Sequence, residues 1–185
     1  ENFDFTQLKG DYVINVDSDD EGVVVVGCAG GPVVKVNLPI RKVPAEHKKE
    51  YYAIKITGLR GGHSGEDIHR GRANANKLLI RVLRELEENV RFDLSDITGG
   101  LKYNAIPRNA EAVIGIEQED KAAMDAVIER FSGIFADEYR VNDPGITLEA
   151  VPQEAADHIL DEASSRRVLD YIDFTETGII RRDQD

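Results

Sequence analysis

Residues 51–83, YYAIKITGLRGGHSGEDIHRGRANANKLLIRVL, contain the pattern that decides the fold class. Large apolar side chains at 52, 54 and 56 alternate with Ala53, Lys55 and Thr57, which predicts a half-buried strand. A glycine-rich loop from Gly58 to Gly71 follows and leads into apolar residues at helical spacing. These continue to Val90 and predict one amphipathic helix. The stretch is therefore a strand, a loop and a helix in direct succession.

The segments that follow repeat both patterns. Strands are predicted from residue 92 to the glycine pair 99–100, at 112–116 and at 146–150, and a second helix at 124–135 with Asp120 as its N-cap. From residue 51 to 151 the order is strand, helix, strand, strand, helix, strand, which is the ferredoxin-like split βαβ order. The fold class that we expect is α+β, an antiparallel sheet with both helices on one face.

The flanking segments carry shorter patterns. Strands are predicted at residues 12–14, 23–26 and 34–38, a polar connector at 41–50, and a strand-like segment at 175–185. Ser164 is the predicted N-cap of a short helix with apolar residues at 168, 169 and 172. The chain opens on Glu1 rather than methionine, so we expect it to belong to a longer protein.

Composition excludes several classes of partner. A net charge of −12 argues against a nucleic-acid or anionic-membrane surface, because both require clustered Lys and Arg. No apolar run approaches the roughly 20 residues of a membrane span, and the first residues do not resemble a signal peptide. The single cysteine, Cys28, cannot form an internal disulfide, and its small apolar neighbours favour a packing role over a reactive thiol. A cytoplasmic setting fits these features.

An acidic loop is the first candidate site. The segment NVDSDDEG, residues 15–22, places Asp17 and neighbouring carboxylates at the end of a predicted strand, where they can ligate a cation. The segment is not a complete calcium loop, because Cys28 stands where the closing glutamate belongs. A solvated acidic turn is the alternative interpretation.

The glycine loop is the second candidate site. Glycines 61, 62 and 65 flank His63, so the backbone there can adopt positive φ and approach a ligand closely. The loop has almost no apolar residue to bury the imidazole, so a core role is not expected. An ordinary surface histidine is the alternative, and it is the expectation for His47 and His69.

Three blocks of the sequence resemble one family in the family's own order. These blocks are INVDSDDEGVVVVGCAGG at 14–31, ITGLRGGHSGEDIHRGRANANKLL at 56–79 and GGLKYNAIPRNAEA at 99–112. They resemble the bacterial aminoacyl-histidine dipeptidases (Xaa-His dipeptidases, peptidase D), which belong to the di-zinc aminoacylases and carboxypeptidases. The resemblance covers nearly all of the chain and implies a lid, or dimerisation, domain inserted into a catalytic domain that binds two zinc ions.

The resemblance also implies site residues and boundaries. Asp17 matches an aspartate that ligates one zinc ion, and His63 matches a lid histidine that reaches the partner's active site and contacts the oxyanion or the substrate carboxylate. Asn104 matches a lid asparagine close to substrate, although a turn-forming role is equally open. The implied boundaries are 1–22 for an edge of the catalytic domain, 23–163 for the lid and 164–185 for a helix and the start of the return segment.

The function that the resemblance implies is that of a lid and dimerisation domain in a cytoplasmic, zinc-dependent dipeptidase acting on Xaa-His and related short peptides. The family's HxD pair and its late histidine ligand are missing, and Glu87-Glu88 lies on the polar face of a predicted helix rather than in the context of the family's Glu-Glu pair. We therefore expect the isolated chain to be inactive and to bind no zinc stably. Expected partners are a dipeptide and a second copy of the chain. Two alternatives stay open: a free-standing ferredoxin-like binding or dimerisation module without catalysis, and a structural dimer module in which His63 is incidental.

Overall fold

The computed structural model describes residues 6, 9–11, 21–23, 30–45 and 48–181. The chain divides into two compact units, Glu1–Asn37 and Leu38–Asp185. The strand predicted at 12–14 and most of that predicted at 23–26 lie outside the described residues. The helices and strands given below all belong to the second unit.

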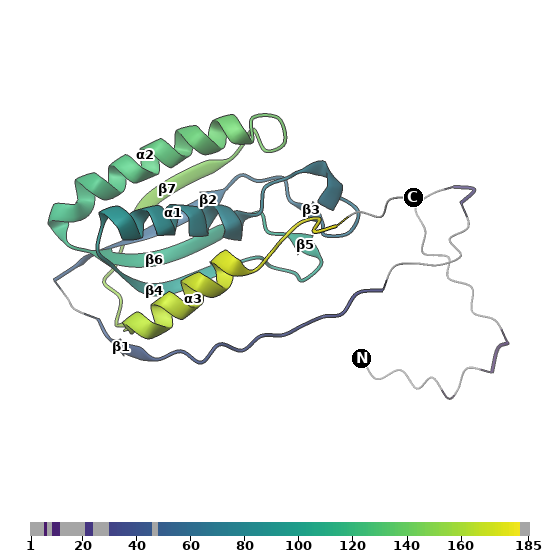
Figure 1. Ribbon diagram of the computed structural model, residues 1–185, viewed down its shortest axis with the longest axis horizontal. Coiled ribbons are helices and arrows are strands. Elements are labelled where there is room, and N and C mark those ends of the chain that lie inside the picture. Colours follow the sequence, from purple (N-terminus) through teal and green to yellow (C-terminus); the bar gives the residue numbers. More distant parts are fainter. Residues whose placement is uncertain (1–5, 7–8, 12–20, 24–29, 46–47, 182–185) are drawn as a thin grey trace. The chain divides into compact units, whose positions relative to one another are not determined.

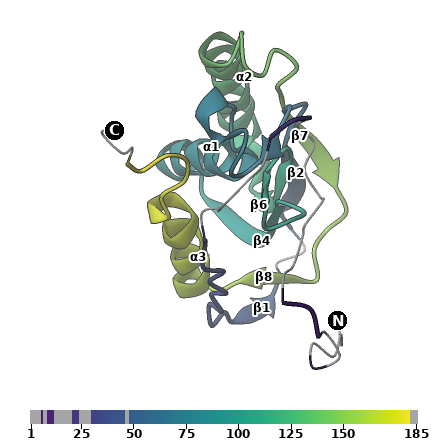
Figure 2. The same ribbon diagram turned by 90° about the vertical axis from the view of Figure 1, so that its right-hand side faces the viewer.

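A four-stranded antiparallel sheet is the centre of this unit (Figure 1). Its strands are β2 (Glu50–Thr57), β4 (Phe92–Gly99), β6 (Ala110–Ile116) and β7 (Thr147–Gln153). They lie in the order β4-β6-β2-β7. Two helices, α1 (Ala75–Asn89) and α2 (Lys121–Glu138), connect β2 to β4 and β6 to β7 and cover one face (Figure 2). The predicted α+β fold with the split βαβ order is confirmed.

The hydrophobic core fills the space between the sheet and these helices. Ile54 in the central strand β2 stands opposite Ala112 of β6 on one side and Ala150 of β7 on the other. Leu79 and Leu83 of α1 are fully buried with it, as the helical spacing predicts. Burial of each such side chain contributes about 1.5–3 kcal/mol relative to exposure, so α1 is held mainly by its apolar face.

The two helices begin differently. The side chain of Asn74 accepts hydrogen bonds from the backbone N–H groups of Asn76 at 3.0 Å and Lys77 at 3.4 Å, and so caps α1. Asp120 stands at the predicted N-cap position of α2, but its backbone is helical and its side chain makes no capping hydrogen bond. The chain enters α2 through a 3-10 turn at Gln118–Asp120 instead, so a side-chain cap has no place there.

A third helix, α3 (Glu162–Phe174), is capped by Asp161, and the prediction of Ser164 as its cap is wrong. The extended backbone of Asp161 lets its carboxylate accept the Ser164 N–H at 2.8 Å. Ser164 is buried in the first turn, where its Oγ accepts the backbone N–H of Arg41 at 2.8 Å. Asp and Ser are both good caps, and the pattern did not separate them.

Ion pairs and hydrogen bonds fasten α3 to α1. The Arg84 guanidinium contacts Asp170 and Asp173 of α3, the latter at 3.0 Å. Burial lowers the pKa of Arg84, but hydrogen bonds to Glu87 and to these two carboxylates outweigh it and raise the pKa. Lys77 Nζ donates to carbonyls at the end of α3, including that of Asp173 at 2.6 Å. The end of α3 is therefore held beside the beginning of α1.

The remaining differences from the predictions concern where short strands form and where they do not. The segment 41–50, predicted as a connector, contains β1 (Lys42–Pro44), which pairs with β8 (His158–Leu160). Residues 30–41 form no strand despite the alternation at 34–38, and residues 175–181 form none either. Alternation favours a strand, but a strand also needs a partner edge. Among the residues that the structure describes, no helix is long and apolar enough to cross a membrane.

Candidate functional site

Two very short strands bring the predicted site residues together. Strand β3 (Gly62–His63) pairs with β5 (Ala105–Ile106), and His63 stands opposite Ala105 (Figure 1). The next residue along, Ser64, donates its N–H to the Asn104 carbonyl at 2.9 Å. The segments His63–Ser64 and Asn104–Ala105 therefore lie side by side, although they come from loops far apart in the sequence.

Asp67 fixes the backbone of His63. The His63 N–H donates to Asp67 Oδ2 at 2.8 Å, and the Asp67 N–H donates to the His63 carbonyl at 3.0 Å. Arg70 and Arg72 form ion pairs with the same carboxylate. The distance is 3.0 Å from Arg70 Nε to Asp67 Oδ1 and 3.6 Å from Arg72 Nη1 to Asp67 Oδ2. The hydrogen bond from His63, followed by the charges of Arg72 and Arg70, lowers the pKa of Asp67, so it is ionised at neutral pH. An ionised carboxylate is the stronger acceptor for the His63 amide.

The imidazole of His63 is fixed in one orientation. Its Nδ1 atom lies 3.2 Å from the backbone nitrogen of Gly65 and 3.2 Å from that of Glu66. A backbone N–H can only donate, so Nδ1 must be the acceptor and the neutral ring carries its proton on Nε2. The His63 side chain is exposed. The arrangement therefore offers an Nε2–H donor of defined direction to an acceptor outside the loop.

Two glycines make this conformation possible. Gly61 has a φ of 63° and Gly62 a φ of 148°, both in the region that side chains rarely adopt. A Cβ on Gly62 would lie 2.5 Å from a terminal nitrogen of Arg72 and from Asp67 Oδ2. The positive φ expected for these glycines is present at Gly61 and Gly62 but not at Gly65, and at Gly62 close packing also excludes a side chain.

Sequence patterns did not single out Asp143, which lies in the turn between α2 and β7. Its carboxylate is buried and accepts the backbone N–H groups of Arg60 and Ala73, each at 2.7 Å. The segment NDPG around it has the composition of a turn and predicted only a turn. The one further signal is that an aspartate in a turn can reach backbone amides, but the sequence cannot tell which ones.

The predicted metal ligand cannot be placed. Asp17 lies outside the described residues, so its role as a zinc ligand stays a prediction. Within the described ranges, no group of three or more His, Cys, Asp or Glu side chains could hold a metal ion. His69 is exposed, as expected for a surface histidine, whereas His47 lies outside the described residues.

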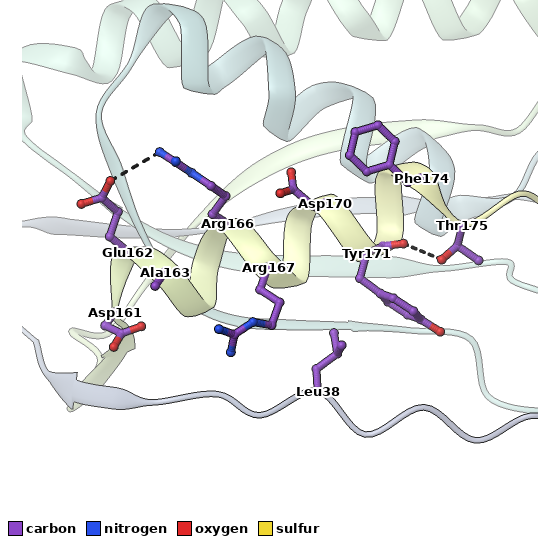
Figure 3. A pocket seen from close by; sticks show the side chains of 10 residues that line it. All are labelled: Leu38, Asp161, Glu162, Ala163, Arg166, Arg167, Asp170, Tyr171, Phe174 and Thr175. Atoms are coloured by element: carbon purple, nitrogen blue, oxygen red, sulfur yellow. Dashed lines mark hydrogen bonds and ion pairs between the residues drawn. The ribbon is translucent and has the colours of Figure 1, made fainter.

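A groove of about 1030 Å³ runs along α3, well away from the glycine loop in the sequence. Figure 3 shows Arg166, Arg167 and Tyr171 projecting from the helix, with Leu38 on the facing segment. Arg166 already pairs with Glu162 at 3.4 Å, and Arg167 donates to the Pro39 carbonyl. The charged side chains of the groove thus have partners within the chain, and none of its lining residues comes from the loops that hold His63 and Asn104.

Comparison with known proteins agrees with this architecture. The sequence profile of the peptidase dimerisation domain matches residues 54–143. The cytosol non-specific dipeptidase of Escherichia coli (strain K12) is 34% identical over 177 residues, which are 94% of this chain and 36% of that protein. The crystal structure of aminoacylhistidine dipeptidase from Vibrio alginolyticus has a TM-score of 0.76 at 24% identity, covers 80% of this chain and 30% of that one, and establishes a common fold. The chain thus spans about a third of the length of these relatives.

Proposed function

Because this chain contains a peptidase dimerisation domain, we propose that it is the lid and dimerisation domain of a zinc-dependent dipeptidase and presents His63 to the active site of a partner subunit. The lid would extend over residues 23–163, with 1–22 belonging to the edge of the catalytic domain and 164–185 leading back to it. The observation that carries the proposal is the fixed imidazole of His63 at the tip of the glycine loop.

The chemistry follows from the position of the proton. When water attacks a peptide carbonyl, negative charge develops on the carbonyl oxygen, and a fixed donor stabilises that charge without reorganising. With Nδ1 occupied by two backbone amides, Nε2–H of His63 is such a donor. The same group can instead bind the carboxylate of a dipeptide. Removal of one donor of this kind typically lowers kcat about 10²- to 10³-fold.

Several features support contact with a second subunit. Leu101 and Tyr103 are 97% and 85% exposed immediately before Asn104, so two large side chains beside the site are available for contact with another surface. In the described sheets, no strand pairs with the outer edge of β7. An open edge favours pairing with another chain. We therefore propose a homodimer in which Asn104 and its neighbours approach the partner's substrate together with His63.

The metal and the cellular setting belong to the same proposal. Zinc would be held by the remainder of the full-length protein, with Asp17 as a ligand from this chain. The relative from Escherichia coli is named a cytosolic dipeptidase, which supports a cytoplasmic setting. Dipeptides ending in histidine are the proposed substrates. Glycyl-histidine and β-alanyl-histidine are the probes, and the isolated chain should cleave neither.

Two variants of the full-length enzyme test the role of His63. His63→Ala should lower kcat about 10²-fold, and His63→Gln should retain part of the activity because its amide can donate from a similar position. Equal turnover by both variants and the unaltered enzyme would favour a structural dimer module in which His63 is incidental. Cleavage of either dipeptide by the isolated chain would contradict the proposed dependence on a catalytic domain.

A further inference from the structure

A buried carboxylate joins the two ends of the glycine loop. Within the described part of the chain, Asp143 is the charged residue that solvent does not reach, with an exposed fraction of 0%. Its Oδ1 accepts the N–H of Arg60 and its Oδ2 accepts that of Ala73, both at 2.7 Å. Arg60 stands just before the glycines that lead to His63, and Ala73 just before the cap of α1. One side chain thus holds both ends of the loop.

The turn that carries Asp143 touches the loop at further points. Asn142 Nδ2 donates to the Gly71 carbonyl at 3.0 Å. A Cβ on Gly58 would lie 1.9 Å from the Gly145 carbonyl oxygen, so the two backbones are in direct contact. The turn itself is fixed, because the Asp143 N–H donates to Tyr139 at 2.8 Å and its carbonyl accepts from Ile146 at 3.1 Å. The base of the loop therefore rests on a rigid support.

A second set of contacts extends this support toward the imidazole. Arg72, which precedes Ala73, donates to the Gly61 carbonyl and lies 3.6 Å from Asp67. Asp67 in turn accepts the His63 N–H at 2.8 Å. The contacts thus run from Asp143 at the base of the loop, through Arg72 and Asp67, to His63 at its tip.

We propose that Asp143 is a positioning residue that holds His63 in the orientation described above. The proposal rests on the function proposed for His63 but concerns the geometry of the loop. A buried carboxylate is costly unless its oxygens are hydrogen-bonded, and here both oxygens are used on the two ends of one loop. If Asp143 served only the stability of the fold, its replacement would lower stability and leave the imidazole of the folded protein unchanged.

Asp143→Asn in this chain separates these possibilities. The amide keeps the shape of the side chain but turns an NH₂ group toward one backbone N–H, so one end of the loop loses its acceptor. In the ¹⁵N spectrum, the His63 ring should move from the Nε2–H tautomer toward a mixture of both tautomers, as expected for a ring whose Nδ1 has no fixed donor. The amides of Gly65 and Glu66 should exchange about tenfold faster or more. The matched control is Asp137→Asn, an exposed position in α2 that should change neither observable.

The proposal would be overturned if the Asp143→Asn protein folds and the His63 spectrum and the amide exchange of Gly65 and Glu66 stay unchanged. If Asp143→Asn does not fold, Arg72→Met interrupts the next contact toward His63 and should shift the same two observables, whereas an unchanged spectrum would overturn the proposed path. Both readouts are spectroscopic and need no activity. If His63 proved not to act in the partner's active site, that result would therefore be distinct from the outcome of these spectroscopic tests.

Discussion

The backbone N–H of His63 donates to the Asp67 carboxylate at 2.8 Å, and the N–H of Asp67 returns a hydrogen bond to the His63 carbonyl at 3.0 Å. This reciprocal pair closes a tight turn in which the imidazole Nδ1 accepts two further amides. The turn needs an ionised Asp67, because a protonated carboxyl is the weaker acceptor. The order of the loop is thereby linked to the charge of one half-buried carboxylate.

This link predicts a pH dependence of the loop. The pKa of Asp67 is lowered from its usual value of 3.8, first by the hydrogen bond from His63. Because the pKa is lower in the folded than in the unfolded protein, the stabilisation of the loop by ionised Asp67 is fully present above pH 3.8. It is lost as the pH falls through the pKa of Asp67 in the folded protein. The amide shifts of His63 and Gly65 should therefore change in that acidic range while the core amides of β2 do not. Asp67→Asn should abolish this transition, and its persistence in the variant would assign it to another group.

Gly62→Ala tests the packing of the loop. The positive φ and the 2.5 Å approach of Arg72 and Asp67 predict a loss of about 1–3 kcal/mol in the free energy of unfolding, measured by urea denaturation. Gly133→Ala is the matched control, because that glycine lies in α2 with nothing within 4 Å of an added Cβ. It should stabilise the protein by about 0.5–1 kcal/mol. Similar effects of the two changes would contradict the strained geometry of Gly62.

A pair of cap variants tests how the helices begin. Asn74→Ala removes the side-chain acceptor for two backbone N–H groups of α1 and should cost about 1 kcal/mol of stability. Asp120→Ala should cost much less, because Asp120 makes no capping hydrogen bond at the start of α2. Thermal unfolding of both variants checks the difference. A larger loss for Asp120→Ala would mean that α2 is capped in solution after all.

The long elements could be predicted because each buries a whole face. The alternation in β2 and the helical spacing of α1 reflect contact with one core, and such periodicity survives in the sequence. The strands β1, β3, β5 and β8 are too short to show a period, and each pairs with a segment distant in the chain. Their existence depends on tertiary contacts, which a local pattern does not contain.

In the candidate site, too, local patterns predicted some features, whereas others depend on tertiary contacts. The glycines around His63 predicted the conformational freedom of the loop, and the resemblance to a family drew attention to His63 and Asn104. The pairing of β3 with β5 brings their segments together, with His63 opposite Ala105 and Ser64 bonded to Asn104, and it could not be foreseen from spacing. Asp143 lies in a segment with the composition of a turn, and nothing local indicates that its carboxylate reaches Arg60 and Ala73.

The most direct measurement is the activity of mixed dimers of the full-length enzyme. One subunit would carry His63→Ala and the other Asp17→Asn, or another change that inactivates the catalytic domain. If His63 acts in the partner's site, each mixed dimer contains one intact site, and random mixing of two nearly inactive variants should restore about a quarter of the unaltered activity. Activity that stays at the average of the two parent variants, with mixed dimers verified by native mass spectrometry, would contradict a trans role for His63.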